Sequence, residues 1–188
     1  YVYIKGKGEL IFEDDPDSAI NLSCLKQGIG LSGEDVGKIR IRKNSGIKKI
    51  LTIENLTTFF RWQEKDSLMI YLGGYHNSVR RKLLELLYQD FPEAEYLHFG
   101  DIDVGGFEIY RDLCRKTGIP FKTYHMGVEE LKKYEAYTRE LTGNDRKRLE
   151  ALLQKAEREG KDTRVLRYMK EQGRKLEQEG IQEYNLDE

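Results

Sequence analysis

The 188-residue chain is poor in the features that mark secreted, membrane and disordered proteins. It has only two cysteines, Cys24 and Cys114, and they form no metal-ligand spacing. No apolar run approaches the ~20 residues needed to span a bilayer, and no signal-peptide pattern is found. Three prolines are too few for long disordered linkers. These absences predict a cytoplasmic protein in a reducing compartment, without contact to a membrane.

A surplus of positive charge is also absent, since the formal net charge is −1. Neutralising phosphates normally requires an excess of Lys and Arg. The charges are segregated, however: residues 9–17 hold five acids and no base, residues 38–49 hold six bases and no acid, and residues 145–175 hold eleven bases against six acids. Such a surface can bind a polyanion. Solvated helix faces with i,i+4 ion pairs would give the same composition.

The length fits one domain with a modest core, or one domain with a helical appendix. The chain begins at Tyr1, in strand-like sequence and without Met, so we expect a fragment of a longer protein. We predict an N-terminal extension at residues 1–46 that is part of the same compact unit. A core at residues 47–137 and a C-terminal helical segment at residues 138–188 would follow.

Four short apolar runs have the composition of β-strands, at residues 49–53, 67–72, 96–99 and 119–126. Helical patterns, including residues 77–88 and 107–117, alternate with them. This spacing predicts right-handed crossovers and a parallel sheet. Parallel strands present their C-terminal ends at one edge, where α/β proteins place their sites. The expected fold is therefore α/β, with a Rossmann-like parallel sheet flanked by helices.

Weaker patterns predict a hairpin or edge strand at residues 1–12, a turn at 14–18, a short basic strand at 38–43, and helices at 146–159 and 163–179. Asp17 or Ser18 could cap a short helix after the turn, and Asn144 or Asp145 could cap the first C-terminal helix. The fold prediction thus includes a β-rich N-terminal extension and C-terminal helices.

Three carboxylates follow these strands. Asp101 and Asp103 come after the strand at residues 96–99, and residues i and i+2 of an extended segment point the same way. Glu54 follows another strand and would reach the same edge. Like charges held this close are tolerable mainly with a cation between them, and oxygen ligands select Mg²⁺ or Mn²⁺. An Asp after a strand can also serve only as a helix N-cap.

This pattern resembles the Toprim domain of topoisomerases, primases and several nucleases, in which a Glu follows one strand and Asp-x-Asp-x-x-Gly a later one. The amino-acid sequence at residues 54–59, 71–76 and 100–107 most resembles the C-terminal Toprim domain of JetD, the nuclease subunit of Wadjet anti-plasmid systems. That domain is related to the A subunit of topoisomerase VI. The resemblance covers residues 47–135, and the Leu-Glu-Gln-Glu run at 176–179 shows a weaker similarity to the same family.

The resemblance implies a divalent-metal-dependent endonuclease that cleaves plasmid or foreign double-stranded DNA. It implies Mg²⁺ or Mn²⁺ as cofactor, Glu54, Asp101 and Asp103 as catalytic and metal-binding residues, condensin-like SMC subunits as partners, and a homodimer that cuts both strands. The covalent tyrosine of topoisomerase VI lies on a winged-helix domain that this chain does not visibly contain. The alternatives are a Toprim domain for strand or nucleotidyl transfer, and a non-catalytic module that binds DNA or a partner.

Glycine pairs occur at two strand-to-helix turns, at Gly73, Gly74, Gly105 and Gly106. Missing side chains there would let a phosphate approach backbone N–H groups, or would simply allow a tight turn. His76 could contact phosphate or cap the next helix. We expect at least one of Arg80 and Arg81 to be on the solvent side and able to meet a DNA phosphate.

Several further residues could belong to the same edge. Glu177, Glu179 or Glu183 could fold back to complete a second metal site, although exposed terminal glutamates are usually solvated. His98 is more typical of a buried residue than of a ligand. His125 ends the last strand and could reach the edge as well.

Overall fold

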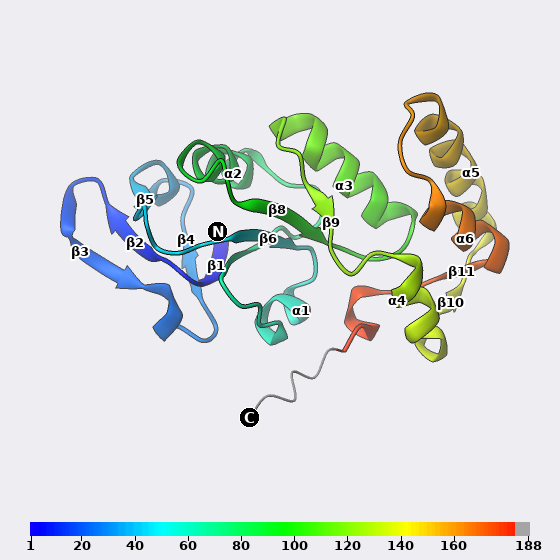
Figure 1. The fold of residues 1–188 in the computed structure, drawn as a ribbon, viewed down its shortest axis with the longest axis horizontal. Coiled ribbons are helices and arrows are strands. Elements are labelled where there is room, and N and C mark those ends of the chain that lie inside the picture. Colours follow the sequence, from blue (N-terminus) through cyan, green and yellow to red (C-terminus); the bar gives the residue numbers. More distant parts are fainter. Residues whose placement is uncertain (183–188) are drawn as a thin grey trace.

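The computed structural model of the protein describes residues 1–182, with a six-stranded sheet at its centre (Figure 1). Its strands are β1 (Val2–Gly6), β4 (Ile29–Leu31), β6 (Lys49–Ile53), β7 (Ser67–Tyr71), β8 (Glu95–Phe99) and β9 (Lys122–Thr123). They lie in the order β4-β1-β7-β6-β8-β9. The strands from β7 to β9 are parallel, whereas β1 and β4 are antiparallel to their neighbours. The predicted α/β fold with a parallel core is confirmed.

The described residues form six α-helices: α1 (Leu56–Arg61), α2 (Ser78–Asp90), α3 (Val104–Thr117), α4 (Val128–Lys133), α5 (Gly143–Arg158) and α6 (Arg164–Gln172). Figure 1 shows α2 and α3 on one side of the sheet and α1 and α4 on the other, with α5 and α6 beyond the end of α3. Within residues 1–182, no helix combines the length and the apolar character of a membrane span.

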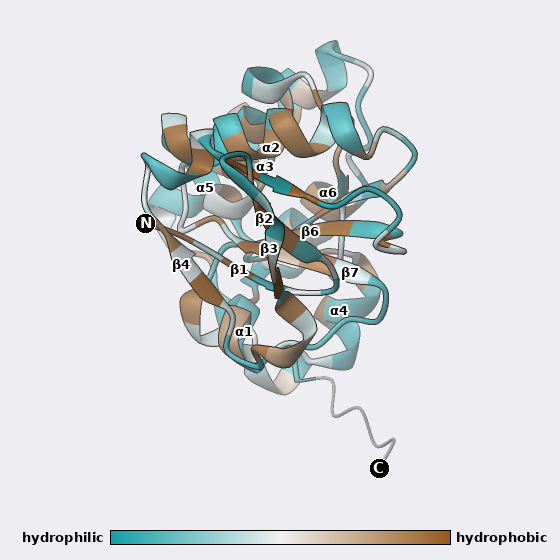
Figure 2. Ribbon diagram, turned by 90° about the vertical axis from the view of Figure 1, so that its left-hand side faces the viewer, coloured by the Kyte–Doolittle hydropathy of each residue, from teal (hydrophilic) through white to brown (hydrophobic). Residues whose placement is uncertain are grey.

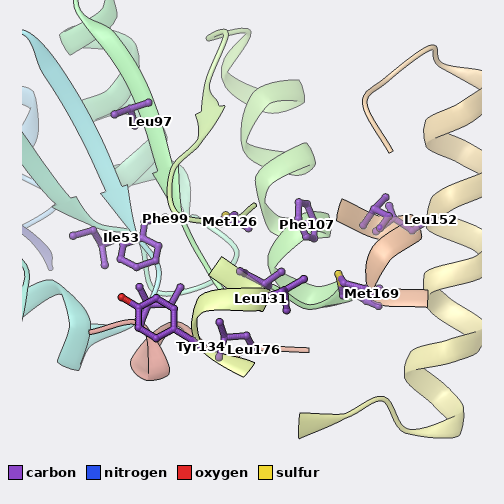
Figure 3. Close-up of a cluster of buried hydrophobic side chains, with 14 of the residues drawn as sticks. Ile53, Leu97, Phe99, Phe107, Met126, Leu131, Tyr134, Leu152, Met169 and Leu176 are labelled. Carbon is purple, nitrogen blue, oxygen red and sulfur yellow. The ribbon is translucent and has the colours of Figure 1, made fainter. Parts of the chain in front are cut away.

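Both faces of the sheet are apolar, because side chains alternate along each strand. On β6, Ile50 belongs to the cluster that packs against α2 and α3, whereas Leu51 and Ile53 belong to the cluster that packs against α1 and α4. The latter cluster continues to α5 and α6 through Leu152 and Met169 (Figure 3). Figure 2 shows hydrophobic and hydrophilic residues interleaved along α2, as in a helix with one buried face. Covering both faces explains why these strands read as continuous apolar runs.

A buried lysine holds α1 in place. Lys5 of β1 is 1% exposed, and its Nζ donates to the carbonyl oxygens of Phe60, at 3.0 Å, and Trp62, at 2.7 Å. These carbonyls belong to the end of α1, where four C=O groups lack partners within the helix. Burial lowers the pKa of Lys5 to about 8. The N-terminal strand therefore fixes the helix that directly follows Glu54.

The N-terminal region builds a second sheet from β2 (Glu9–Phe12), β3 (Asp15–Asn21) and β5 (Ile39–Ile41), in the order β3-β2-β5. The basic strand is confirmed as β5. Residues 1–12 do not form the expected hairpin or edge strand, because β1 lies inside the central sheet and β2 in the second. Gly6 and Gly8, with φ of 102° and 136°, let the chain pass from one sheet to the other.

The turn predicted at residues 14–18 begins one residue earlier, at Glu13 and Asp14, between β2 and β3. Asp15 pairs with Phe12 and Ala19 with Ile11, so residues 16–18 form an irregularity in the pairing. The helix cap predicted at Asp17 or Ser18 is wrong. The short 3₁₀ helix begins only at Leu22, and the side chain of Asn21 caps it by accepting a hydrogen bond from Ser23 N at 3.0 Å.

The C-terminal helices are confirmed, but their bounds differ from the prediction. Thr142, rather than Asn144 or Asp145, is the N-cap of α5, and Asp145 completes its capping box. The expected helix at residues 163–179 ends at Gln172, since Gly173 adopts a left-handed conformation with φ of 65°.

After Gly173 the chain becomes extended. Strand β11 (Arg174–Lys175) pairs antiparallel with β10 (Arg139–Glu140). Leu176 then exchanges two backbone hydrogen bonds with Ile102, of 2.8 and 3.1 Å. In Figure 1 this segment returns from α6 past α4 toward α1. The residues after α6 are thereby carried back to the central sheet.

Close contact between α3 and the loop before it leads to a first prediction. A Cβ at Gly106 would lie 2.2 Å from the backbone oxygen of Asp101. We expect Gly106→Ala to displace α3 and to lower the free energy of unfolding by about 1–3 kcal/mol, a cost typical of overpacking. Urea denaturation followed by circular dichroism measures this change. In Gly143→Ala, the control, the new Cβ meets nothing within 4 Å, so stability should stay equal or rise slightly. Equal stability of the two variants would contradict the prediction.

Candidate active site

The candidate site lies where β6 and β8 end. These strands are parallel neighbours, with Ile53 paired to Phe99. Pairing continues one residue further, because Glu54 N donates to Phe99 O at 3.0 Å. Gly100 and Asp101 follow Phe99 directly. Glu54 and Asp101 therefore emerge from adjacent strands at the same edge of the sheet.

Asp103 is the N-cap of α3. Its backbone is extended, and its Oδ1 accepts a hydrogen bond from Gly106 N at 2.8 Å. The helix-capping role that the sequence allowed for an Asp after this strand is therefore confirmed for Asp103. It leaves the carboxylate close enough to Glu54 to act on it electrostatically. The structure thus places Asp101 and Asp103 close enough to Glu54 for their charges to act on it.

Burial and mutual repulsion both act on this group. Burial, together with the charges of Asp101 and Asp103, raises the pKa of Glu54 to about 7. Burial also raises the pKa of Asp101 to about 6, although the N–H of Gln178 opposes this by donating to its Oδ1 at 2.6 Å. The Oε2 atom of Glu54 is buried and has no hydrogen-bond partner among residues 1–182. Such carboxylates are destabilised unless a proton or a cation neutralises them.

Within residues 1–182, no group of three or more His, Cys, Asp and Glu side chains is gathered so that it could hold a metal ion. Protein donors engage all three candidate carboxylates: the N–H of Gln178 donates to Asp101, the N–H of Gly106 to Asp103, and the backbone N–H of Asp101 to Glu54. The chemistry of the donors nevertheless suits a hard divalent cation, and Glu54 keeps an unpaired oxygen.

The returning C-terminal segment reaches this edge, and Gln178 is its central residue. Gln178 is fully buried, and its Nε2 donates to Phe99 O at 2.8 Å, while its Oε1 accepts from Asn55 N at 2.8 Å. Together with the bond from its backbone N–H to Asp101, it joins the ends of β6 and β8. Sequence reasoning missed this residue. The Leu-Glu-Gln-Glu run at 176–179 indicated that this segment resembles the family, but it did not indicate that Gln178 joins the two strands.

Two of the three C-terminal glutamates considered from the sequence lie near the site. Glu177 and Glu179 both raise the pKa of Asp101 by their charge, after burial and Asp103. Glu177 is paired with Arg139, and Glu179 accepts a hydrogen bond from the Asn55 side chain at 2.8 Å. Glu183 lies outside the described residues.

The two glycine turns differ in what they offer a ligand. Gly73 and Gly74 have φ of 67° and 78°, so both need the left-handed conformation that glycine tolerates. Gly105 and Gly106 lie in the first turn of α3, and the N–H of Gly106 is already bound by Asp103. A phosphate-binding role for these turns stays a prediction.

The predicted DNA contacts lie near α2. His76 is 7% exposed, so little of its ring is accessible. The guanidinium of Arg80 packs over the Tyr71 ring at 5.6 Å and donates to Tyr1 O at 3.4 Å. Arg81 lies 3.8 Å from Glu85 across one helical turn. Their contact with DNA stays a prediction.

The other two histidines lie on opposite faces of the sheet. His98 is fully buried, and burial lowers its pKa to about 3, so its ring is neutral. Its ring stacks on Tyr110 of α3 at 6.0 Å. His125 packs against Trp62 and Phe99, and its Nδ1 lies 3.2 Å from a Glu130 oxygen.

The chain matches a protein-family model described as "Wadjet protein JetD, C-terminal" over residues 17–187. It is also similar to Wadjet protein JetD of Bacillus cereus strain Q1, with 29% identity over 140 residues. The alignment covers 72% of this chain and 33% of that protein. The chain therefore corresponds to a third of the length of this relative.

The bonds of Gln178 lead to a second prediction. Gln178→Ala leaves the N–H of Asn55 without this partner, whereas the C=O of Phe99 still accepts from Glu54 N. We expect the free energy of unfolding to fall by about 1–3 kcal/mol, the cost of one unsatisfied buried group. Chemical denaturation measures this loss. Gln172→Ala, at an exposed position, is the control and should change stability by less than about 0.5 kcal/mol. A Gln178 variant as stable as this control would refute the prediction.

The raised pKa of Glu54 leads to a third prediction, for protein kept in EDTA. Between the ordinary value of 4.5 and about 7, the folded protein binds more protons at Glu54 than the unfolded chain does. The contribution of this residue to stability therefore falls as pH rises through that window. We expect Glu54→Gln to gain stability relative to wild type from pH 4.5 to pH 7, and the gain to stay constant above it. Urea unfolding at several pH values measures this.

Glu150→Gln is a control of opposite sign. A hydrogen bond from Lys170 lowers the pKa of Glu150, so its carboxylate stabilises the folded state once ionised. Its replacement should lose stability relative to wild type as pH rises through its ordinary pKa. A Glu54→Gln variant that shows no gain with pH would contradict the assigned burial of Glu54.

Proposed function

This chain belongs to the family of C-terminal domains of the Wadjet protein JetD. We propose that it is a divalent-metal-dependent DNA endonuclease domain. It would cleave plasmid or other foreign double-stranded DNA within a Wadjet-type defence complex. The observation that carries this proposal is that Glu54 and Asp101 follow adjacent parallel strands, and that the charges of Asp101 and Asp103 act on a Glu54 carboxylate that keeps one unpaired oxygen.

Glu54, Asp101 and Asp103 would hold Mg²⁺ or Mn²⁺. The bound cation would supply neutralisation of charge on the scissile phosphate and activation of the attacking water. Their oxygens are the ligands that such ions prefer, and the raised pKa values of Glu54 and Asp101 indicate that neutralising charge is favourable here. Binding by all three residues would require the Asp103 carboxylate to turn from its capping bond or to share it.

The chain's own residues would perform the remaining tasks. Glu54 would take a proton from the attacking water, because its Oε2 has no hydrogen-bond partner among residues 1–182 and is left to accept one. Gln178 would keep the loops after β6 and β8 in register, since it binds both strand ends. Burial of the carboxylates strengthens each electrostatic interaction inside the site.

The DNA itself would lie across the carboxyl edge, where Arg80 and Arg81 of α2 and the turn with Gly73 and Gly74 flank the carboxylates. Cutting two antiparallel strands calls for two such sites related by a two-fold axis, which supports a homodimer. Condensin-like SMC subunits would supply the circular DNA, as the family membership suggests.

One observation favours a second candidate, a non-catalytic module that binds DNA or a partner subunit. Among residues 1–182 no set of side chains is already arranged to hold a metal ion. In that case the carboxylates would serve as helix cap and as partners of the C-terminal segment alone. The two candidates differ in whether free DNA ends are produced.

Asp103→Asn tests the proposal most cleanly, because asparagine also caps helices well while the charge is lost. In the full-length protein we expect cleavage of plasmid DNA with Mg²⁺ or Mn²⁺ to fall by about 100-fold or more, beyond the loss typical of residues that only support metal ligands. Gel electrophoresis of nicked and linear plasmid measures the rate.

Asp162→Asn, on the exposed loop between α5 and α6, is the matched control and should cleave like wild type. Wild-type activity in the Asp103→Asn variant would refute the site assignment. If the wild-type protein binds plasmid but leaves it intact with either ion, the binding-module alternative holds. Ends carrying covalently attached protein would instead indicate strand transfer.

A further inference from the structure

Below the carboxylates, on the face of the sheet covered by α2 and α3, lie polar side chains that the proposed chemistry does not use. Thr52 of β6 and His98 of β8 are paired across the parallel strands, and both are fully buried. Along each strand they are two residues before Glu54 and Gly100, so they share a face with these positions. A polar layer therefore lies directly beneath the edge that carries the acids.

The hydrogen bonds of Thr52 assign a tautomer to His98. The Thr52 hydroxyl lies 3.1 Å from Leu97 O, to which it can donate its single proton, and 3.0 Å from His98 Nδ1. With that proton given to Leu97 O, Thr52 accepts from Nδ1. We therefore assign the proton of the neutral ring to Nδ1, which leaves His98 Nε2 as an acceptor.

This acceptor and the unpaired oxygen of Glu54 meet at Gly100. A Cβ built on Gly100 would lie 2.9 Å from His98 Nε2 and 2.7 Å from Glu54 Oε2. Both atoms are buried, and neither has a hydrogen-bond partner among residues 1–182. Nε2 and the ionised Glu54 carboxylate are both acceptors and cannot bond to each other, but one water can donate a proton to each of them. Only glycine at position 100 leaves both atoms room at this point.

We propose that His98 is a positioning residue for Glu54, acting through one water held between His98 Nε2 and Glu54 Oε2 beside Gly100. Thr52 orients the imidazole, the imidazole orients the water, and the water orients the carboxylate. The inference rests on the proposed function in so far as Glu54 serves cleavage. The hydrogen-bond relation itself does not depend on it. Groups that orient a metal-binding residue in this way typically change metal affinity or activity 10–100-fold when removed.

Two replacements of His98 separate this role from simple packing. In His98→Asn the amide reaches about as far as Nδ1, so the contact with Thr52 can persist while nothing stands at the position of Nε2. In His98→Gln the amide reaches about as far as Nε2. We expect His98→Asn to lower the single-turnover cleavage rate or the Mn²⁺ affinity of the full-length protein by 10–100-fold. The cleavage rate and Mn²⁺ affinity of the Gln variant should stay within about threefold of wild type, since its amide keeps a polar group at the position of Nε2.

Mn²⁺ affinity is measured by isothermal titration calorimetry without DNA, so this comparison does not require cleavage. The thermal unfolding temperatures of the two variants are compared alongside. A structural role would lower the unfolding temperature without separating Asn from Gln in Mn²⁺ affinity. Equal rates and equal Mn²⁺ affinities of the Asn and Gln variants would overturn the proposal.

A spectroscopic readout tests the relation independently of metal and DNA. Long-range ¹H–¹⁵N spectra of the imidazole rings in EDTA should show His98 protonated on Nδ1 in the wild type. Thr52→Val should disturb this tautomer, whereas Thr52→Ser should preserve it. Glu54→Gln should shift the Nε2 resonance of His98, because the shared water loses its charged acceptor.

These outcomes separate the two proposals. If wild-type protein leaves plasmid intact while the spectra and Mn²⁺ affinities behave as expected, the nuclease function fails and the positioning by His98 stands. If plasmid is cleaved but Glu54→Gln leaves the Nε2 resonance of His98 unchanged, the positioning fails and the nuclease function stands.

Discussion

The hydrogen bond from Glu54 N to Phe99 O extends the parallel pairing of β6 and β8 by one residue, and the whole candidate site depends on it. Neighbouring strands lie only about 4.8 Å apart. Acidic residues that follow two neighbouring strands at the same register are therefore close enough for their charges to interact. Burial is the main cause of the raised pKa values of Glu54 and Asp101, and the charges of neighbouring carboxylates add to it. A folded state that buries acids in this way is typical of sites that bind a charged ligand.

The C-terminal return couples the outer helices to this edge. Leu176 pairs with Ile102, and Gln178 then binds the ends of both central strands. The same apolar cluster that covers the sheet below β6 also contains Leu152 of α5 and Met169 of α6 (Figure 3). Packing of these helices therefore determines where Gln178 lies, and Gln178 in turn determines the surroundings of Asp101.

Local signals predicted the parallel core well, because strands buried on both faces are apolar throughout and their helices are strongly periodic. They failed where a long-range partner decided the conformation. Asp17 and Ser18 look like the cap of a helix, yet they lie within strand β3 beside β2. The run after Gln172 has helical periodicity, yet Gly173 ends the helix and leaves Leu176 to pair with Ile102.

By itself, the sequence determined the parallel core and the placement of Glu54, Asp101 and Asp103 after strands, because the alternation of strands with helices can be recognised from local composition. Only the tertiary structure decided that Gln178 would join the strand ends and that His98 would face Glu54 across Gly100. These relations link residues far apart in the chain through single atoms. Sequence pattern carries no information on such contacts, whereas packing of the sheet against its helices fixes them.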